Sequence, residues 1–271
     1  MTTRRPVVAG QFYPRNAQEL REDVEQYLSD ADVEPAPESA VAVVVPHAGY
    51  IFSAWTAGFA YARVRGKKPK RVIVVGCSHR HPIRTASVWD KGAFETPLGS
   101  FPIDEAFAGE LAEQWESKSI DPHLPEHSIE VQLPFLEVAV GLVPIVPVLF
   151  GSPATQWHAE AGAKLAEMVD ETDLVVASTD LSHYLREEDA HQIDKRTVDA
   201  VLSRDTADVI DGLRHDTYSM CGGSAVVAAM AFAGACGAEA CSLWDYRTSA
   251  ETSGDYNSVV GYTAITMERP A

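Results

Sequence analysis

Residues 41–50 read VAVVVPHAGY, a run of mostly β-branched residues that ends in a proline and a histidine. Two other runs have the same form: VIVV at 72–75 precedes GCSHRH, and LVVA at 174–177 precedes STDLSHY. Continuous apolar strands without polar alternation are typical of a sheet that is covered on both faces. Amphipathic stretches at 104–115 and 188–202 indicate helices between such strands. This alternation predicts an α/β sandwich around one central sheet.

The composition is that of a globular protein. The chain has 271 residues, of which 46% are hydrophobic and 23% charged. Both values lie near the globular average, which excludes disordered and fibrous classes. Neither an internal repeat nor a low-complexity tract divides the sequence, and we therefore predict a single domain over residues 1–271.

Two segments have an unusual composition. Residues 143–150 read VPIVPVLF, and their two prolines predict an edge strand or an irregular segment. Residues 217–238 carry no charge, but their continuous apolar part is too short to cross a membrane comfortably. For this second segment we predict a helix buried in the core.

The charge balance narrows the classes of partner. The sequence has 22 Lys and Arg against 39 Asp and Glu, a net charge of −17. Such a surface repels phosphate backbones and anionic lipids, so neither nucleic acid nor membrane is expected as a partner. The four cysteines do not form a disulfide scaffold, and the N-terminus lacks the apolar core of a signal peptide. These features predict a cytoplasmic protein.

Three of the predicted strands end in a polar turn that contains a histidine: His47, His79 and His183. The carboxyl ends of strands in open α/β sheets converge on one ligand site. A single histidine of this kind is usually a turn residue, but three in equivalent positions indicate a shared site. Asp180 lies in the same turn as His183. The histidines in acidic or helical surroundings are predicted to be surface residues: His123, His158, His191 and His215.

Two further residues are candidates for this site. Cys221 precedes Gly222-Gly223 and an Ala-rich helix, whose unpaired N–H groups favour a thiolate; the alternative is a buried apolar residue. His127 lies three residues before Glu130, and the two share a face if the segment is helical. Acidic residues here also suit the first turn of a helix, so both interpretations of this pair stay open.

The motifs present favour a metal site. The sequence contains no Gly-x-Ser-x-Gly nucleophile elbow and neither of the glycine-rich nucleotide motifs. Histidines and a thiolate together suit transition metals such as iron, copper, zinc and nickel. Asp180 and His183 would orient the metal ligands or move protons.

Several ordered motifs resemble the Memo family, whose members are also called AmmeMemoRadiSam system protein B. The matching stretches are AGQFYP at 9–14, PHAGY at 46–50, GCSH at 76–79, EHSIE at 126–130, QLPFL at 132–136, STDLSHY at 178–184 and CG at 221–222. The resemblance covers nearly the whole chain. It implies a fold similar to the class III extradiol, LigB-type, non-haem iron dioxygenases.

The resemblance also implies a metal site. Memo-like proteins bind a metal through two histidines and a cysteine, which correspond here to His47, His79 and Cys221. The positions that line the same cavity correspond to Asp180, His183 and His127. Ring-cleaving dioxygenases have a glutamate as the third ligand. A cysteine in its place argues against ring cleavage and favours Cu(I) or Fe(II). The sequence also departs from the family at Cys77, where proline is common.

Two functions follow from the resemblance. In the first, the protein is a redox metalloenzyme that holds Fe(II) or copper and acts on O2 or a small organic molecule. His183 would then move protons, supported by Asp180 and His127. In the second, the fold is a non-catalytic module whose cavity binds a peptide or a modified side chain. Radical SAM and AMMECR1-type proteins are the partners that the resemblance implies.

Overall fold

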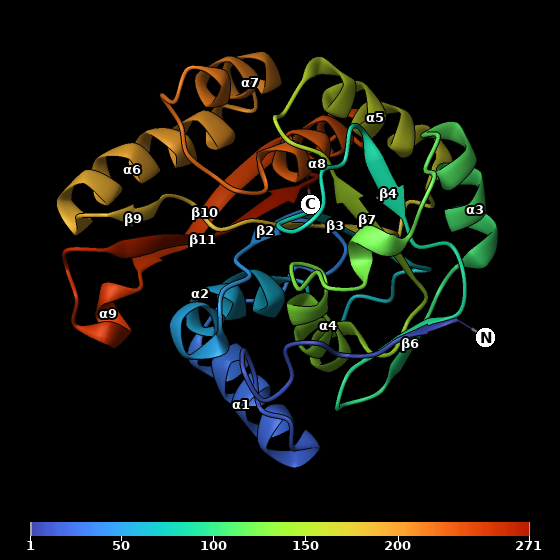
Figure 1. Cartoon of the computed structure of the whole chain (residues 1–271), viewed down its shortest axis with the longest axis horizontal. Coiled ribbons are helices and arrows are strands. Elements are labelled where there is room, and N and C mark those ends of the chain that lie inside the picture. The colour runs from blue at the N-terminus through green and yellow to red at the C-terminus, as the bar shows by residue number, and fades with distance from the viewer. Residues whose placement is uncertain (1, 271) are drawn as a thin grey trace.

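An eight-stranded mixed sheet forms the centre of the computed structural model, which describes residues 2–270 (Figure 1). In spatial order its strands are β10 (Ala240–Thr248), β11 (Val259–Glu268), β2 (Ala40–Val45), β8 (Leu174–Ser178), β3 (Val72–Cys77), β7 (Ile145–Phe150) and β4 (Ala86–Val88), with β9 (His183–Leu185) paired to β11. Helices cover both faces. The predicted α/β sandwich around a central sheet is confirmed.

The four central strands explain the continuous apolar runs of the sequence. β2, β8, β3 and β7 are parallel neighbours, whereas β4, β10 and β11 run antiparallel to the strands beside them. Every residue of these four parallel strands is buried. Because parallel strands end at the same edge of a sheet, the turns after β2, β8 and β3 are neighbours in space.

Two layers of helices enclose the sheet. One face carries α1 (Ala17–Asp30), α2 (Tyr50–Arg63) and α4 (Leu133–Val140), and the other carries α5 (Gln156–Met168), α6 (Glu187–Ser203), α7 (Thr206–Arg214) and α8 (Gly223–Ala235) (Figure 1). The helix α3 (Glu105–Gln114) packs on β4 and β7. α2 connects β2 to β3 and α5 connects β7 to β8, so these crossovers lie on opposite faces. Such an arrangement opens a crevice at the strand ends.

The remaining elements are short. A three-stranded sheet contains β1 (Thr3–Arg4), β5 (Ala93–Glu95) and β6 (Ser100–Pro102). The 3-10 turns are η1 (Asp121–His123) and η2 (Glu130–Gln132), and α9 (Ala250–Ser253) lies between β10 and β11. The helices predicted at 104–115 and 188–202 are present as α3 and α6.

The uncharged segment at 217–238 forms the buried helix predicted from its composition. Its helical part is α8, which contacts the four central strands and packs against α5. Most of its side chains are buried, which explains why it carries no charge. Within residues 2–270, no helix combines the length and the hydrophobicity that a membrane span requires.

The structure corrects the prediction for residues 143–150. β7 is a regular strand between β3 and β4, neither an edge nor an irregular segment. The carbonyl of Pro147 accepts a hydrogen bond from the backbone N–H of Trp89, at 3.1 Å. Because the N–H and C=O groups of one residue point to the same side of a strand, the missing N–H of Pro147 faces the end of short β4. The missing N–H of Pro147 therefore removes no hydrogen bond between β7 and β3.

Two histidines predicted to lie at the surface are buried instead. His123 is 1% exposed and His158 is 2% exposed, whereas His191 and His215 are exposed as predicted. The Nε2–H of His123 donates to the carbonyl of Ser87 at 2.9 Å, and His158 takes part in the capping box of α5. A buried imidazole is tolerated when partners satisfy its polar atoms, as for Nε2 of His123; Nδ1 of His158 has partners, whereas its buried Nε2 has none among the described residues.

Candidate metal centre

Four side chains with soft or imidazole donors converge where β2, β3 and β8 end. They are His47 after β2, Cys77 at the end of β3, His79 just beyond it, and Cys221 just before α8. Their ligand atoms all lie within 4.8 Å of one another. The sequence predicted His47, His79 and Cys221 as metal ligands, and the fold brings these three together.

The ring of His47 is fixed so that one nitrogen points at Cys221. Its Nδ1 lies 2.9 Å from the Ser178 hydroxyl oxygen, and its Nε2 lies 3.2 Å from the Cys221 sulfur. The Ser178 hydroxyl donates its own proton to the Ser128 carbonyl at 2.6 Å. Nδ1 of His47 must therefore be the donor in its bond to Ser178. The backbone N–H of His47 donates to Asp180 Oδ1 at 2.7 Å, which holds the residue from its other side.

Glu126 fixes His79 in the same way. The carboxylate accepts hydrogen bonds from the backbone N–H of His79 at 2.7 Å and from its Nδ1 at 3.0 Å. The backbone N–H groups of His127 and Ser128 donate to the same carboxylate. Burial raises the pKa of Glu126, but these hydrogen bonds hold it well below its usual value. The Cys77 sulfur lies 3.6 Å from Nε2 and 4.0 Å from Nδ1 of His79. Because Glu126 engages Nδ1, Nε2 is the nitrogen available to a metal.

Cys221 is the more acidic of the two neighbouring thiols. A hydrogen bond with Cys77 holds the pKa of Cys221 well below its usual value, and the charge of His47 acts in the same direction. The backbone N–H of Asp180 also donates to the Cys221 sulfur at 3.3 Å. The same pairing, together with burial, raises the pKa of Cys77.

The charge on Cys221 acts in turn on the two imidazoles. Burial alone would lower the pKa of His47, but the Cys221 thiolate and the Asp180 carboxylate raise it to about 9. Hydrogen bonds to Cys221 and Glu126 raise the pKa of His79 to about 10. A metal ion binds neutral imidazole, so metal binding would displace the Nε2 protons into solvent.

Two glycines allow the backbone to approach this closely. A Cβ on Gly222 would lie 2.3 Å from the carbonyl oxygen of Ser178, and one on Gly76 would lie 2.5 Å from the hydroxyl of Ser128. Neither position has room for a larger residue. The glycine that follows Cys221 thus lets the start of α8 lie against the end of β8.

Comparison with known proteins shows the family of this chain. The family described as "Memo-like protein" matches residues 4–266 of this chain. A MEMO1 family protein from Methanopyrus kandleri is 35% identical over 98% of this chain and 99% of its own length, and one from Thermotoga maritima is 33% identical over 97% and 99%. The chain belongs to the Memo-like family. The resemblance inferred from the sequence motifs is confirmed.

A solved structure shares the fold of this Memo-like chain. The crystal structure of the uncharacterized protein JW3007 from Escherichia coli K12 matches with a TM-score of 0.50 and 16% identity. The match covers 83% of this chain and 99% of that one. At this identity the likeness concerns the fold alone.

Of the other predicted site residues in this Memo-like protein, His127 and Asp180 contact the cluster directly. The His127 ring stacks on that of His79, with centroids 4.8 Å apart and planes at 21°, and meets the His47 ring edge-on at 5.5 Å. Burial and the positive charge of His47 lower the pKa of His127 to about 4, so its ring stays neutral at neutral pH. Asp180 is the acceptor for the backbone of His47.

His183 stands further from the donors. It lies half-buried on β9, where its backbone pairs with Val260 of β11. Across residues 2–270, no hydrogen bond or ring contact joins it to His47, Cys77, His79 or Cys221. Its influence on the site passes through Asp180, whose carboxyl group it affects electrostatically.

Glu130, left open by the sequence, has a structural role. Its side chain is fully buried and forms an ion pair with Arg4. It also accepts hydrogen bonds from the Tyr13 hydroxyl at 2.6 Å and from the backbone N–H groups of Val7 and Val8. Glu130 thus anchors the N-terminal segment, whereas His127 faces the metal ligands. Glu126 is the site residue that the sequence analysis missed, because its position also suited a helix start.

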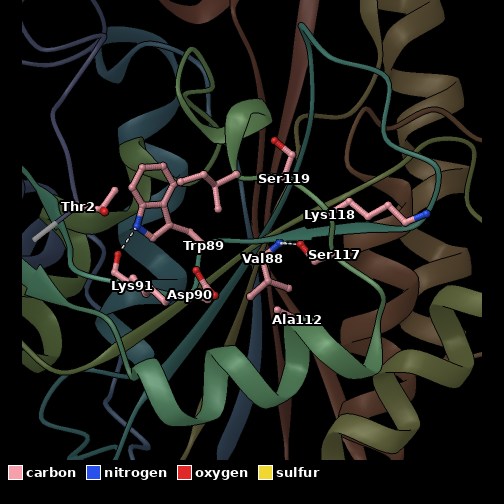
Figure 2. A pocket seen from close by; sticks show the side chains of 10 residues that line it. Thr2, Val88, Trp89, Asp90, Lys91, Ala112, Ser117, Lys118 and Ser119 are labelled. Atoms are coloured by element: carbon pink, nitrogen blue, oxygen red, sulfur yellow. Dashed lines mark hydrogen bonds between the residues drawn. The ribbon is translucent and has the colours of Figure 1, made fainter.

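Two cavities differ in their position relative to the cluster of donors. A cavity of about 440 Å³ lies beside β4, but none of the ten residues that line it belongs to the cluster (Figure 2). Two of its polar groups are paired within the lining: Trp89 Nε1 donates to the Lys91 carbonyl, and the Val88 N–H donates to the Ser117 hydroxyl. A smaller cavity of about 170 Å³ includes Cys221 in its wall. It lies between residues 152–154 after β7 and the segment that leads into α8.

Proposed function

We propose that this Memo-like protein binds a transition metal, iron or copper, through His47, His79 and Cys221 and uses it in redox chemistry. One observation carries the proposal. Ser178 and Glu126 engage the Nδ1 atoms of the two imidazoles, so that Nε2 of each ring is the nitrogen available to a metal; it lies 3.2 Å from the Cys221 sulfur in His47 and 3.6 Å from the Cys77 sulfur in His79. Oriented imidazoles with a hydrogen-bonded second nitrogen are the usual arrangement around a protein-bound metal. Imidazole and thiolate are donors that suit iron and copper.

The remaining residues would support this chemistry. A bound iron or copper ion would supply one-electron redox chemistry. His127, which is stacked on the His79 ring, would support proton transfer by His183. Asp180 fixes His47 through its backbone, and His183 is the proposed proton carrier on the far side of Asp180.

The cavity beside Cys221 suggests the size of the substrate. At about 170 Å³ it suits a small organic molecule, and Tyr218, Met220 and Leu213 contribute to its walls. The exposed wall of this cavity is mainly polar, with Ser152, Ser219 and Ser224 among its residues, so the molecule that it suits is a polar one. Radical SAM and AMMECR1-type proteins are proposed as partners in a shared modification pathway.

Metal content tests the proposal directly. The untagged protein, purified without oxygen, is analysed for iron and copper beside the variant His47→Ala/Cys221→Ala. We expect about one metal ion per chain in the wild type and none in the variant. A matched variant, His191→Ala/Cys241→Ala, removes the same residue types away from the cluster and should keep the metal.

Oxygen consumption with catechols and thiols then tests the redox role of the loaded protein. Absence of metal from the wild type, even after Fe(II) and Cu(I) are offered anaerobically, would contradict the proposal. That result would favour the non-catalytic, peptide-binding alternative.

A further inference from the structure

Cys77 is a buried cysteine that is not one of the three proposed metal ligands. It is the last residue of β3 and is 7% exposed. Its sulfur lies 3.6 Å from Nε2 of His79 and within 4.8 Å of the ligand atoms of His47 and Cys221. Among the described residues, these four side chains form one group of mutually close donors.

Packing does not explain the position of Cys77. A buried free cysteine usually behaves as a small apolar residue in a hydrophobic core. Over residues 2–270 the main core cluster includes the preceding residues of β3, Val72 to Val75, but not Cys77. Cys236 and Cys241, in contrast, both pack against that cluster. The Cys77 side chain therefore belongs to the group of four donors and not to the hydrophobic core.

Two of the donor pairs have the spacing expected in a single metal shell. Metal–sulfur bonds of about 2.3 Å and metal–nitrogen bonds of about 2.0 Å at tetrahedral angles place neighbouring donors about 3.5 Å apart. The distance from Cys77 Sγ to His79 Nε2 is 3.6 Å, and that from Cys221 Sγ to His47 Nε2 is 3.2 Å. The Cys77 sulfur lies beside the His79 ring, nearer to Nε2 than to Nδ1, which is 4.0 Å away.

We propose that Cys77 is a fourth protein ligand, so that the metal is held by two imidazoles and two thiolates. The inference rests on the proposed function, because it assumes that His47, His79 and Cys221 bind a metal. On binding, the Cys77 thiol loses its proton to solvent and its sulfur forms the bond to the metal. Two thiolates favour soft or tetrahedral ions such as Cu(I), Fe(II) and Zn(II). Three protein donors leave a position open in a tetrahedral shell, whereas with four donors O2 or a small molecule would bind by expanding the shell to five.

Cobalt(II) titration tests this assignment. Co²⁺ is added to the reduced, metal-free protein under anaerobic conditions, and the sulfur-to-cobalt charge-transfer absorption is recorded at saturation. The intensity of this absorption increases with the number of bound thiolates. We expect Cys77→Ala to bind one cobalt ion with about half of the wild-type intensity, because one of two thiolates is lost. The matched variant Cys241→Ala should retain the full intensity.

Two outcomes separate this inference from the proposed function. Full charge-transfer intensity in Cys77→Ala would overturn the fourth ligand and leave the three-ligand site intact. A wild type that takes up neither cobalt nor any other metal would overturn both.

If Cys77→Ala does not fold, X-ray absorption on the metal-loaded wild type decides the question. We expect two sulfur neighbours at about 2.3 Å from the metal. A single sulfur neighbour would overturn the proposal.

Discussion

Glu126 and Glu130 lie four residues apart on one segment, and both are buried, but they serve different parts of the molecule. Glu126 accepts hydrogen bonds from the ring and the backbone of His79. Glu130 forms an ion pair with Arg4 and accepts a hydrogen bond from Tyr13. The first acid orients a candidate metal ligand, and the second holds the N-terminal segment against the body of the protein.

The difference arises from the turn between the two acids. η2 begins at Glu130, and the residues before it are not helical, so Glu126 and Glu130 do not share a helical face. Residue type and sequence neighbourhood are almost the same for both. What differs is the distant segment that each carboxylate meets. Loss of Glu130 should therefore reduce stability, whereas loss of Glu126 should reduce metal affinity.

The largest effect is expected for Glu130→Gln. The side chains of Arg4 and Glu130 are 2% and 0% exposed, so the neutral amide would leave the Arg4 guanidinium buried without a counter-charge. Breaking such a buried pair costs about 3–5 kcal/mol of unfolding free energy. Urea unfolding measures this loss, while metal content per folded molecule should stay unchanged. An exposed control, Glu113→Gln on α3, should change stability by about 0.5 kcal/mol at most.

Glu126→Gln should reduce metal affinity rather than stability. The amide removes the charge that orients Nδ1 of His79 but leaves every proposed metal ligand in place. Loss of such an orienting carboxylate reduces metal affinity by about 10–100-fold. Competition with a chelator of known affinity measures the change, with folded Glu130→Gln as the matched control. Unchanged affinity combined with a stability loss as large as that of Glu130→Gln would remove the distinction between the two acids.

His123 extends the comparison to pH. It belongs to the anchoring side of the segment, because its carbonyl accepts a hydrogen bond from Nε of Arg4 at 3.1 Å. Burial lowers the pKa of His123 to about 3, against about 6.5 in the unfolded chain. Between these values the unfolded state binds more protons, so stability falls as the pH falls from about 6.5 toward 3.

The variant His123→Gln should show a shallower pH dependence. The slope of the unfolding free energy against pH should be smaller by about 1 kcal/mol per pH unit, because one histidine no longer takes up a proton on unfolding. Urea midpoints at pH 4.5–6.5 measure it. His191→Gln replaces an exposed histidine on α6 and should follow the wild-type curve. Parallel curves for wild type and His123→Gln would show that the buried His123 ring takes up no proton on unfolding.

Much of the frame could be predicted from the sequence. The β-branched runs gave the central strands, and the histidines after them marked the edge where His47 and His79 meet. The predictions that were wrong depend on distant partners. The ring of His123 is buried because the carbonyl of Ser87 satisfies it, and Pro147 fits a regular strand because β4 ends beside it.

The sequence by itself determined the α/β sandwich and the residue types at its strand ends, because hydrophobic runs and polar turns are local features. Only the tertiary structure decided which groups act together. Ser178 lies 131 residues from the His47 ring that it orients, and Glu126 lies 47 residues from His79. Hydrogen-bond partners across such separations depend on the packing of strands and turns. No local pattern contains that information, and it emerges only when the chain folds.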